Sequence, residues 1–187
     1  TDAITIKVTG TTATATQLIA IDAATSVKVN ASAVTSITDS AATLKTMYAS
    51  KTISGLGNED VSFVDLAAVV ADDVNAILKA TTGKVTATVT AADAESLNKD
   101  LKDAKGTDAL ILTVSTGTVA ASDLKALDAK TSVAVDADVA GLVITGNAAD
   151  VKTVLKAEGI TLDKVTAGAV AVTVTGTVSA ADANTIA

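Results

Sequence analysis

A short amphipathic segment recurs about every 20 to 32 residues along this chain of 187 residues. One copy, TVAASDLKALDAKT, covers residues 118–131, and imperfect copies begin at Thr12, Val89, Gly146 and Thr177. Periods of this size are typical of supersecondary units that stack, because a single unit cannot bury its apolar face alone. The repeat therefore constrains the fold more than any single residue does.

Seven repeats can be aligned on Asp123, which we use as the anchor position. The equivalent residues are Gln17, Thr43, Asp73, Asp93, Asp123, Asp150 and Asp182. An apolar residue follows each anchor directly and another stands three residues further on, as Leu124 and Leu127 do. Apolar residues three apart lie on one face of a helix, so each repeat is predicted to contain a helix of about two turns.

Polar residues also stand three positions before most anchors, where they can cap the predicted helices. A Ser, Thr or Asn side chain at the N-cap accepts a hydrogen bond from an early helical N–H, and a polar N3 residue can return it. An acidic N3 residue also favours the positive end of the helix dipole. We therefore assign structural N-cap or N3 roles to Thr14, Gln17, Ser40, Thr90, Asp93, Asp123, Asn147, Asp150, Ser179 and Asp182.

Between the predicted helices, apolar and polar residues alternate with a period of two, which is typical of half-buried strands. Such segments cover residues 4–10, 61–66, 84–90, 109–114, 132–139 and 170–178, with second strands expected in longer units, as at 141–146. Strands separated by helices are expected to pair in parallel. The predicted fold is an α/β solenoid with parallel β-sheet, built from stacked strand–short-helix repeats, in a single domain over residues 1–187.

The segment 50–65 departs most from the repeat, and we expect it to form either a projecting loop or an irregular coil. No polar capping repeat is visible at either end, and the last copy stops at Ala187 after one helical turn. Because a soluble solenoid needs capped ends, the chain is expected to be a fragment of a longer repetitive protein.

The composition excludes several classes of site. The sequence has no Cys, His, Pro, Trp or Arg, so it offers no His/Cys metal site, thiol nucleophile or Ser-His-Asp triad. Its net charge of -7 and 1% aromatic content argue against nucleic-acid binding, and its apolar runs are too short for membrane insertion. We do not expect an enzyme, although two Asp residues on adjacent coils would suffice for acid–base catalysis.

Thr alternates with small apolar residues in several predicted strands. Stacked strands would then present a Thr-lined face, on which Thr86, Thr88, Thr173 and Thr175 are the candidate binding residues. Such a face would suit a glycan or ice. The simpler interpretation is that Thr favours the solvent side of a sheet.

Acidic clusters at residues 58–60, 71–73 and 135–138 offer hard oxygen ligands for Ca²⁺. The sequence contains neither an EF-hand loop nor a GGxGxD nonapeptide, so a solvated acidic surface is the preferred interpretation. No cofactor is expected apart from Ca²⁺ as a candidate, and no metal ligand can be assigned.

The units at residues 118–137 (TVAASDLKALDAKTSVAVDA) and 172–187 (VTVTGTVSAADANTIA) resemble the degenerate repeats of large secreted bacterial surface proteins of the RTX- or haemolysin-like, cyanobacterial type. The resemblance covers nearly the whole chain. It implies export without disulfides, an extracellular or cell-surface location, an S-layer, fibre or adhesin role, and calcium dependence. The calcium nonapeptides of that family are absent here, so no functional residue is carried over.

The sequence therefore predicts a non-enzymatic structural or adhesive repeat module of a large extracellular bacterial surface protein. Its expected partners are other copies or neighbouring repeats of the same polypeptide, with surface polysaccharide as a further candidate. The alternative function is a binding module that uses the Thr-lined face for glycan or ice.

Overall fold

The computed structural model describes residues 2–162 and 170–186. It divides into two compact units, Thr1–Thr88 and Val89–Ala187. In each unit short helices follow short strands along the chain, and the described strand pairs within each unit are parallel. The predicted α/β class with parallel sheets is confirmed, whereas a single domain over the whole chain stays a prediction.

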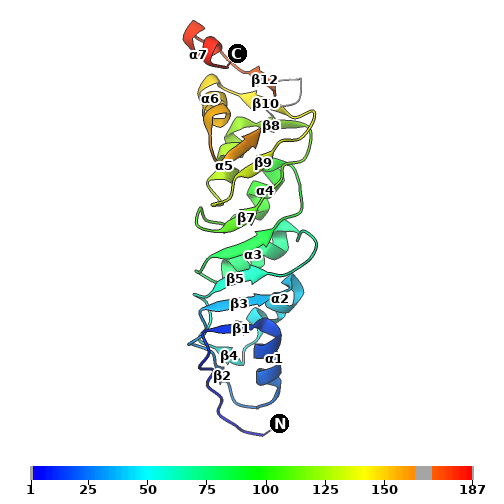
Figure 1. Cartoon of the computed structure of the whole chain (residues 1–187), viewed down its shortest axis with the longest axis vertical. Helices are drawn as coiled ribbons and strands as arrows, with labels where there is room; N and C mark the ends of the chain where they lie inside the picture. Colours follow the sequence, from blue (N-terminus) through cyan, green and yellow to red (C-terminus); the bar gives the residue numbers. More distant parts are fainter. Residues whose placement is uncertain (1, 163–169, 187) are drawn as a thin grey trace. The chain divides into compact units, whose positions relative to one another are not determined.

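The first unit contains a ladder of parallel strands beside a row of helices. Its described elements are β1 (Thr12–Thr14), α1 (Ala15–Ala23), β2 (Val29–Asn30), β3 (Ser36–Asp39), α2 (Ala41–Ala49), β4 (Ile53–Ser54), β5 (Asp60–Phe63), α3 (Ala71–Ala80) and β6 (Val85–Thr88). The ladder runs β1-β3-β5-β6, and β2 pairs separately with β4. Figure 1 shows β1, β3 and β5 one above another, with α1 and α2 beside them. Thr12 pairs with Ser36 and Ser36 with Asp60, so one repeat of this unit advances the chain by 24 residues.

The second unit repeats this arrangement with a less regular spacing between paired residues. Its described elements are α4 (Ala94–Asp100), β7 (Ala109–Ile111), β8 (Thr118–Ala120), α5 (Ala121–Asp128), β9 (Val135–Ala137), β10 (Val143–Gly146), α6 (Ala148–Lys156), β11 (Ile160–Leu162), β12 (Ala171–Val174) and α7 (Ala180–Ile186). Here β10 pairs with β8 on one side and β12 on the other, and β9 pairs with β11.

The core of each unit lies between the inward side of its strands and the apolar face of its helices. In the first unit Ile37, Val61 and Val85 occupy one register and are fully buried. The residue after the anchor is buried in the first six repeats, as for Leu44 in α2 and Leu124 in α5. In the last repeat the corresponding residue, Ala183 in α7, is exposed. Burying a Leu or Val side chain stabilises a fold by about 1.5–3 kcal/mol. The repeated aliphatic side chains therefore supply the buried apolar surface in a chain that is only 1% aromatic.

Buried threonine hydroxyls join one repeat to the preceding one. The hydroxyl of Thr131 accepts a hydrogen bond from the N–H of Leu110 at 3.0 Å and lies 2.8 Å from the carbonyl oxygen of the same residue. Thr25 makes the same two contacts with Ile4 in the first unit. Thr81 donates to the carbonyl oxygen of Glu59 at 2.7 Å. Each hydroxyl thus bonds to the backbone of the preceding repeat.

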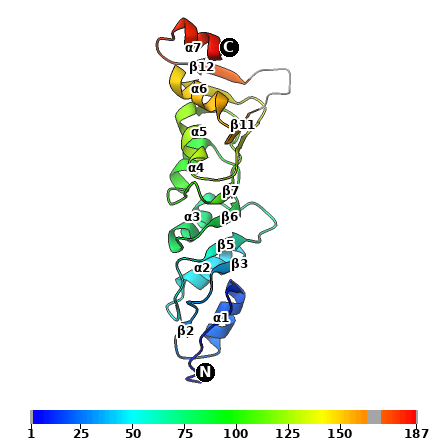
Figure 2. The same cartoon turned by 60° about the vertical axis from the view of Figure 1, so that its left-hand side comes forward.

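Two predictions about local structure need correction. The strand predicted at 4–10 is wrong: Lys7 forms only an isolated bridge with Asn30, because the Thr25 hydroxyl takes the backbone groups of Ile4. The segment 50–65 contains β4 and β5, so it is an irregular coil for most of its length. The chain projects only after β5: Figure 2 shows the segment between β5 and α3 extending on the side of these strands away from α3.

Candidate functional site

Most of the predicted capping residues lie at helix N-termini as expected. Thr14 and Gln17 form a reciprocal capping box at α1. Ser40, Asn147 and Ser179 each accept a hydrogen bond from the backbone N–H of their anchor residue, at 3.4, 2.9 and 3.1 Å. These contacts satisfy backbone donors that a helix leaves unpaired, which is a structural role.

The assignment of Thr90 as an N-cap is wrong. The helix α4 begins at Ala94, and its N-cap is Asp93, whose carboxylate accepts from the N–H of Ser96 at 2.8 Å. This hydrogen bond lowers the pKa of Asp93 below its ordinary value of 3.8. The helix starts late because Ala92 still forms a bridge with Val114, which keeps the preceding backbone extended.

Asp123 does lie at the third position of α5, within its first turn. The N-cap of that helix is Ala120, which has no side chain to accept a hydrogen bond, so the capping box is incomplete there.

Ion pairs between successive helices form a series that the capping interpretation missed. Lys45 of α2 pairs with Asp73 of α3, Lys125 of α5 with Asp150 of α6, and Lys152 of α6 with Asp182 of α7. In each pair the Lys stands two residues after one anchor, and the Asp is the next anchor. The recurring spacing of Lys after the anchor was the sequence signal for this lysine–aspartate ladder.

Two carboxylates of the ladder, those of Asp150 and Asp182, have a lowered pKa. Hydrogen bonds from Lys125 and then Asn147 hold the pKa of Asp150 below 3.8. The pKa of Asp182 is lowered in the same way by Lys152 and Ser179. Because the charged form is favoured in the folded chain, both carboxylates stabilise their helix contacts at neutral pH.

A second set of aspartates accepts hydrogen bonds from the first turn of a helix in the preceding repeat. Asp39, at the end of β3, accepts from both the N–H and the hydroxyl of Thr16 in α1, at 2.8 and 2.7 Å. Burial acts to raise the pKa of Asp39, but the hydrogen bonds from Thr16 and Ser40 outweigh it and lower the pKa. Asp65 accepts from the N–H of Ala41 in α2 at 2.9 Å.

The predicted Thr-lined face is divided between the two units. Thr86 and Thr88 are exposed on β6 in the first unit, and Thr173 and Thr175 are exposed in or beside β12 in the second. In the first unit Thr14, Thr38, Ser62 and Thr86 share one register, which makes a row of hydroxyl-bearing residues across four strands. In the second unit the register of Thr173 contains Thr145 and then Ala120, so the hydroxyl row is interrupted.

One carboxylate in each acidic cluster already has a partner within the fold. Asp73 pairs with Lys45, Asp60 accepts from the N–H of Lys84, and Asp136 accepts from the N–H of Asp138. In residues 2–162 and 170–186 there is no group of three His, Cys, Asp or Glu residues placed to hold a metal ion.

The most unusual polar contact joins Tyr48 to Glu59 in the first unit. Glu59 is fully buried and accepts from the Tyr48 hydroxyl with one oxygen. Its other oxygen accepts from the N–H groups of Gly57 and Asn58, at 2.8 and 3.1 Å. Burial, reinforced by the Glu59 carboxylate, raises the pKa of Tyr48 well above its ordinary value of 10.0.

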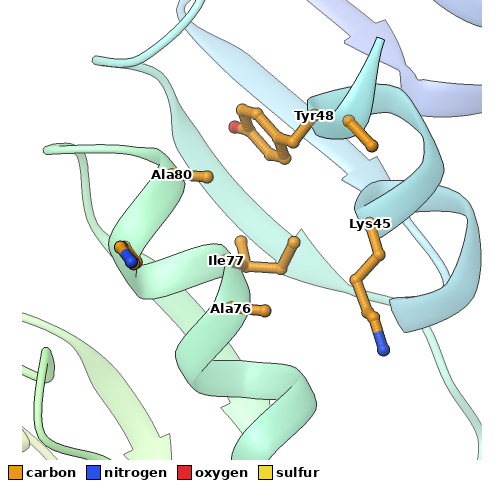
Figure 3. A pocket seen from close by; sticks show the side chains of 7 residues that line it. Lys45, Tyr48, Ala76, Ile77 and Ala80 are labelled. Carbon is orange, nitrogen blue, oxygen red and sulfur yellow. The ribbon is translucent and has the colours of Figure 1, made fainter.

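The Tyr48 ring borders an open groove of about 420 Å³ between α2 and α3. Its lining residues are Lys45, Tyr48, Ala49, Ala76, Ile77, Lys79 and Ala80, and we call this feature the Tyr48 groove. Figure 3 shows Ala76, Ile77 and Ala80 of α3 facing Tyr48 and Lys45 of α2. A corresponding hollow between α6 and α7 is more polar, with Lys152, Thr153, Lys156 and Thr185 in its lining. The Tyr48 groove is therefore shaped for apolar contact and has lysines at its rim.

Comparison with models of known protein families, with curated proteins and with solved structures finds no match. Among the described residues, no helix combines the length and apolar character that crossing a membrane requires.

Proposed function

We propose that the chain is an α/β solenoid that serves as a non-enzymatic structural or adhesive module of a large extracellular bacterial surface protein. In this role a stack of coils spaces or displays other domains, or packs with further copies into a layer or fibre. The proposal follows the resemblance of its Ala-, Thr-, Val- and Asp-rich repeats to those of secreted surface proteins.

The observation that carries the proposal is the recurrence of the same contacts between successive repeats. Parallel pairing, buried threonine corners and the lysine–aspartate ladder each link a repeat to its neighbour over 21 to 30 residues. A stack in which each unit depends on its neighbours gains stability by adding units, which suits a spacer or a scaffold. These recurring contacts all connect one repeat with another.

Light scattering coupled to size exclusion, with and without millimolar Ca²⁺, tests this function, followed by electron microscopy of any large species. Ordered sheets or filaments are the expected result, and a calcium requirement would make the acidic clusters ligands. A monomer that releases reducing ends from polysaccharides would overturn the proposal in favour of an enzyme.

A second candidate function is glycan or ice binding by the hydroxyl row of the first unit. It is favoured by the register of Thr14, Thr38, Ser62 and Thr86, which spaces hydroxyls at the strand separation of about 4.8 Å. Thr86→Lys and Thr88→Lys should abolish binding on a glycan array or in an ice-recrystallisation assay. Thr46→Lys, on the exposed side of α2, is the matched control. Unchanged binding in the strand variants would exclude this face.

A further inference from the structure

The first and last repeats leave open the positions that the repeats between them bury. The residue four places after the anchor is at most 1% exposed in the five inner repeats, and the strand residues Ile37 and Ile144 are fully buried. The equivalent side chains of the two terminal repeats are partly exposed: Ile21 in α1 and Ile186 in α7, and Ala13 in β1 and Val172 in β12. Each inner repeat is covered from both sides, so the terminal repeats each lack one neighbour.

The strands of these two repeats each have a free edge. β1 ends one ladder and β12 ends another, and no strand in the described part of the chain pairs with their outer edges. The carbonyl oxygen of Thr11 accepts from Ser36 at 3.1 Å, so the backbone groups of the next residue, Thr12, point to the outer edge of β1. The N–H of Thr175 donates to the last residue of β10 at 2.8 Å, so those of Val174 point to the outer edge of β12. An edge of unpaired groups is a template for a further strand.

The two free edges match each other in register. Placing Val172 of β12 opposite Ala13 of β1 continues the row of inward residues, because their present partners are the buried Ile144 and Ile37. Thr173 then lies opposite Thr14, which joins the hydroxyl-bearing positions of the two units into one row. One register thus satisfies both faces of the sheet, whereas a shift by one residue would turn the inward side chains outward.

The helices of these repeats are complementary at the position of the lysine–aspartate ladder. Each Lys of the ladder stands two residues after an anchor and pairs with the next anchor. The corresponding residue of α7 is Asn184, and the first anchor of the chain is Gln17; both are exposed. The Gln17 side-chain oxygen already accepts from the N–H of Thr14 at 2.9 Å, which leaves its amide NH₂ as a donor for the Asn184 oxygen. A neutral amide pair would therefore replace the ion pair at this contact.

We propose that the last repeat of one copy of this chain, β12 and α7, stacks on the first repeat of a second copy, β1 and α1, as a further parallel repeat. The inference rests on the self-association in the proposed function and names the surfaces that make it. The contact continues the interface by which β12 and α7 already pack on β10 and α6. Because the two surfaces differ, the contact is heterologous, and a dimer keeps one free surface of each kind. Assembly therefore continues beyond the dimer.

The test measures weight-average mass by light scattering over a concentration series of the whole chain. The wild type should rise above the mass of one chain, 18.3 kDa, as concentration increases. Asn184→Lys combined with Gln17→Asp recreates a ladder pair between copies, and should associate at a protein concentration about two- to five-fold lower. This gain should disappear in about 0.5 M salt, which screens exposed charges. Both positions are exposed and Asp is the anchor in most other repeats, so the fold should stay intact.

Two further variants should weaken the contact. Asn184→Asp combined with Gln17→Asp places two carboxylates together, and should require a higher protein concentration than the wild type. Thr46→Asp with Asn58→Asp, at exposed positions of the first unit, adds the same charge and should associate like the wild type. Thr12→Pro removes a backbone donor from the free edge of β1, where Pro is tolerated, and should stay at the mass of one chain. Circular dichroism checks that each variant is folded.

The possible outcomes separate this contact from the proposed function. Equal association of the Lys/Asp and the two-carboxylate variants, or assembly of folded Thr12→Pro at the wild-type concentration, would overturn the stacking. Self-association would then use another surface, and the proposed function would stand. A monomeric wild type at every concentration would overturn the stacking as well, but would leave the spacer role in the proposed function intact.

Discussion

The ammonium group of Lys125 in α5 binds the carboxylate of Asp150 in α6, although 25 residues separate them in the sequence. Asp150 also donates its backbone N–H to the side chain of Asn147, the N-cap of its own helix. One residue thus serves the start of its helix and the contact with the preceding helix. The same double role belongs to Asp182, which binds Lys152 and Ser179.

Removing the lysine should raise the pKa of Asp150 towards 3.8, as in Lys125→Met. The folded-state pKa of Asp150 lies below its unfolded value, so the Lys125–Asp150 pair stabilises the folded chain at pH values above the unfolded pKa. This contribution is lost as pH falls through the lower, folded pKa. Carboxyl chemical shifts followed by NMR during an acid titration measure the effect. Lys102→Met, on an exposed residue with no ion pair in the described part of the chain, should leave the Asp150 titration unchanged.

Replacing Thr131 by valine should lower the free energy of unfolding by about 1–3 kcal/mol, since it leaves the Leu110 backbone groups without their buried partner. Urea denaturation followed by circular dichroism provides the measurement. Thr161→Val, on an exposed position of β11, is the matched control and should change stability by less than about 0.5 kcal/mol. Equal effects in the two variants would contradict the role of the buried hydroxyl.

Tyr48→Phe should destabilise the first unit by about 1–3 kcal/mol, because the buried Glu59 carboxylate loses a donor. In the wild type the pKa of Tyr48 is raised on folding, so its contribution is present below pH 10.0 and is lost as pH rises above it. Near-ultraviolet absorbance should show no phenolate until the chain unfolds in alkali. Phenolate formation near pH 10.0 in the folded protein would contradict the buried contact.

Gly83→Ala should be destabilising by about 1–3 kcal/mol, because a Cβ atom there would lie 2.3 Å from the carbonyl oxygen of Glu59. Gly10→Ala is the control, since its nearest neighbour would be the Thr12 oxygen at 3.6 Å. Thermal unfolding of both variants distinguishes a close approach of two repeats from a general intolerance of substitution. Similar melting temperatures would remove the argument for close packing at Gly83.

The helices were predictable because their signal is local. Leu124 and Leu127 are three residues apart and both are buried, and Thr14 and Gln17 cap α1 as their spacing indicates. Thr90 has the same local signal, but it is not the N-cap of a helix. Ala92 forms a bridge with Val114, 22 residues later, and this pairing delays the start of the helix. A local pattern cannot report a competing long-range pair.

The sequence by itself determined the repeat, its short amphipathic helices and the α/β class with parallel strands, because these follow from hydrophobic periodicity and chain connectivity. Only the tertiary structure decided which residues meet across repeats. The partner of Asp150, the burial of Glu59 against Tyr48 and the exposure of Leu66 all depend on how far the chain advances per repeat. That advance varies with each connection, so the register is fixed only when the repeats pack against one another.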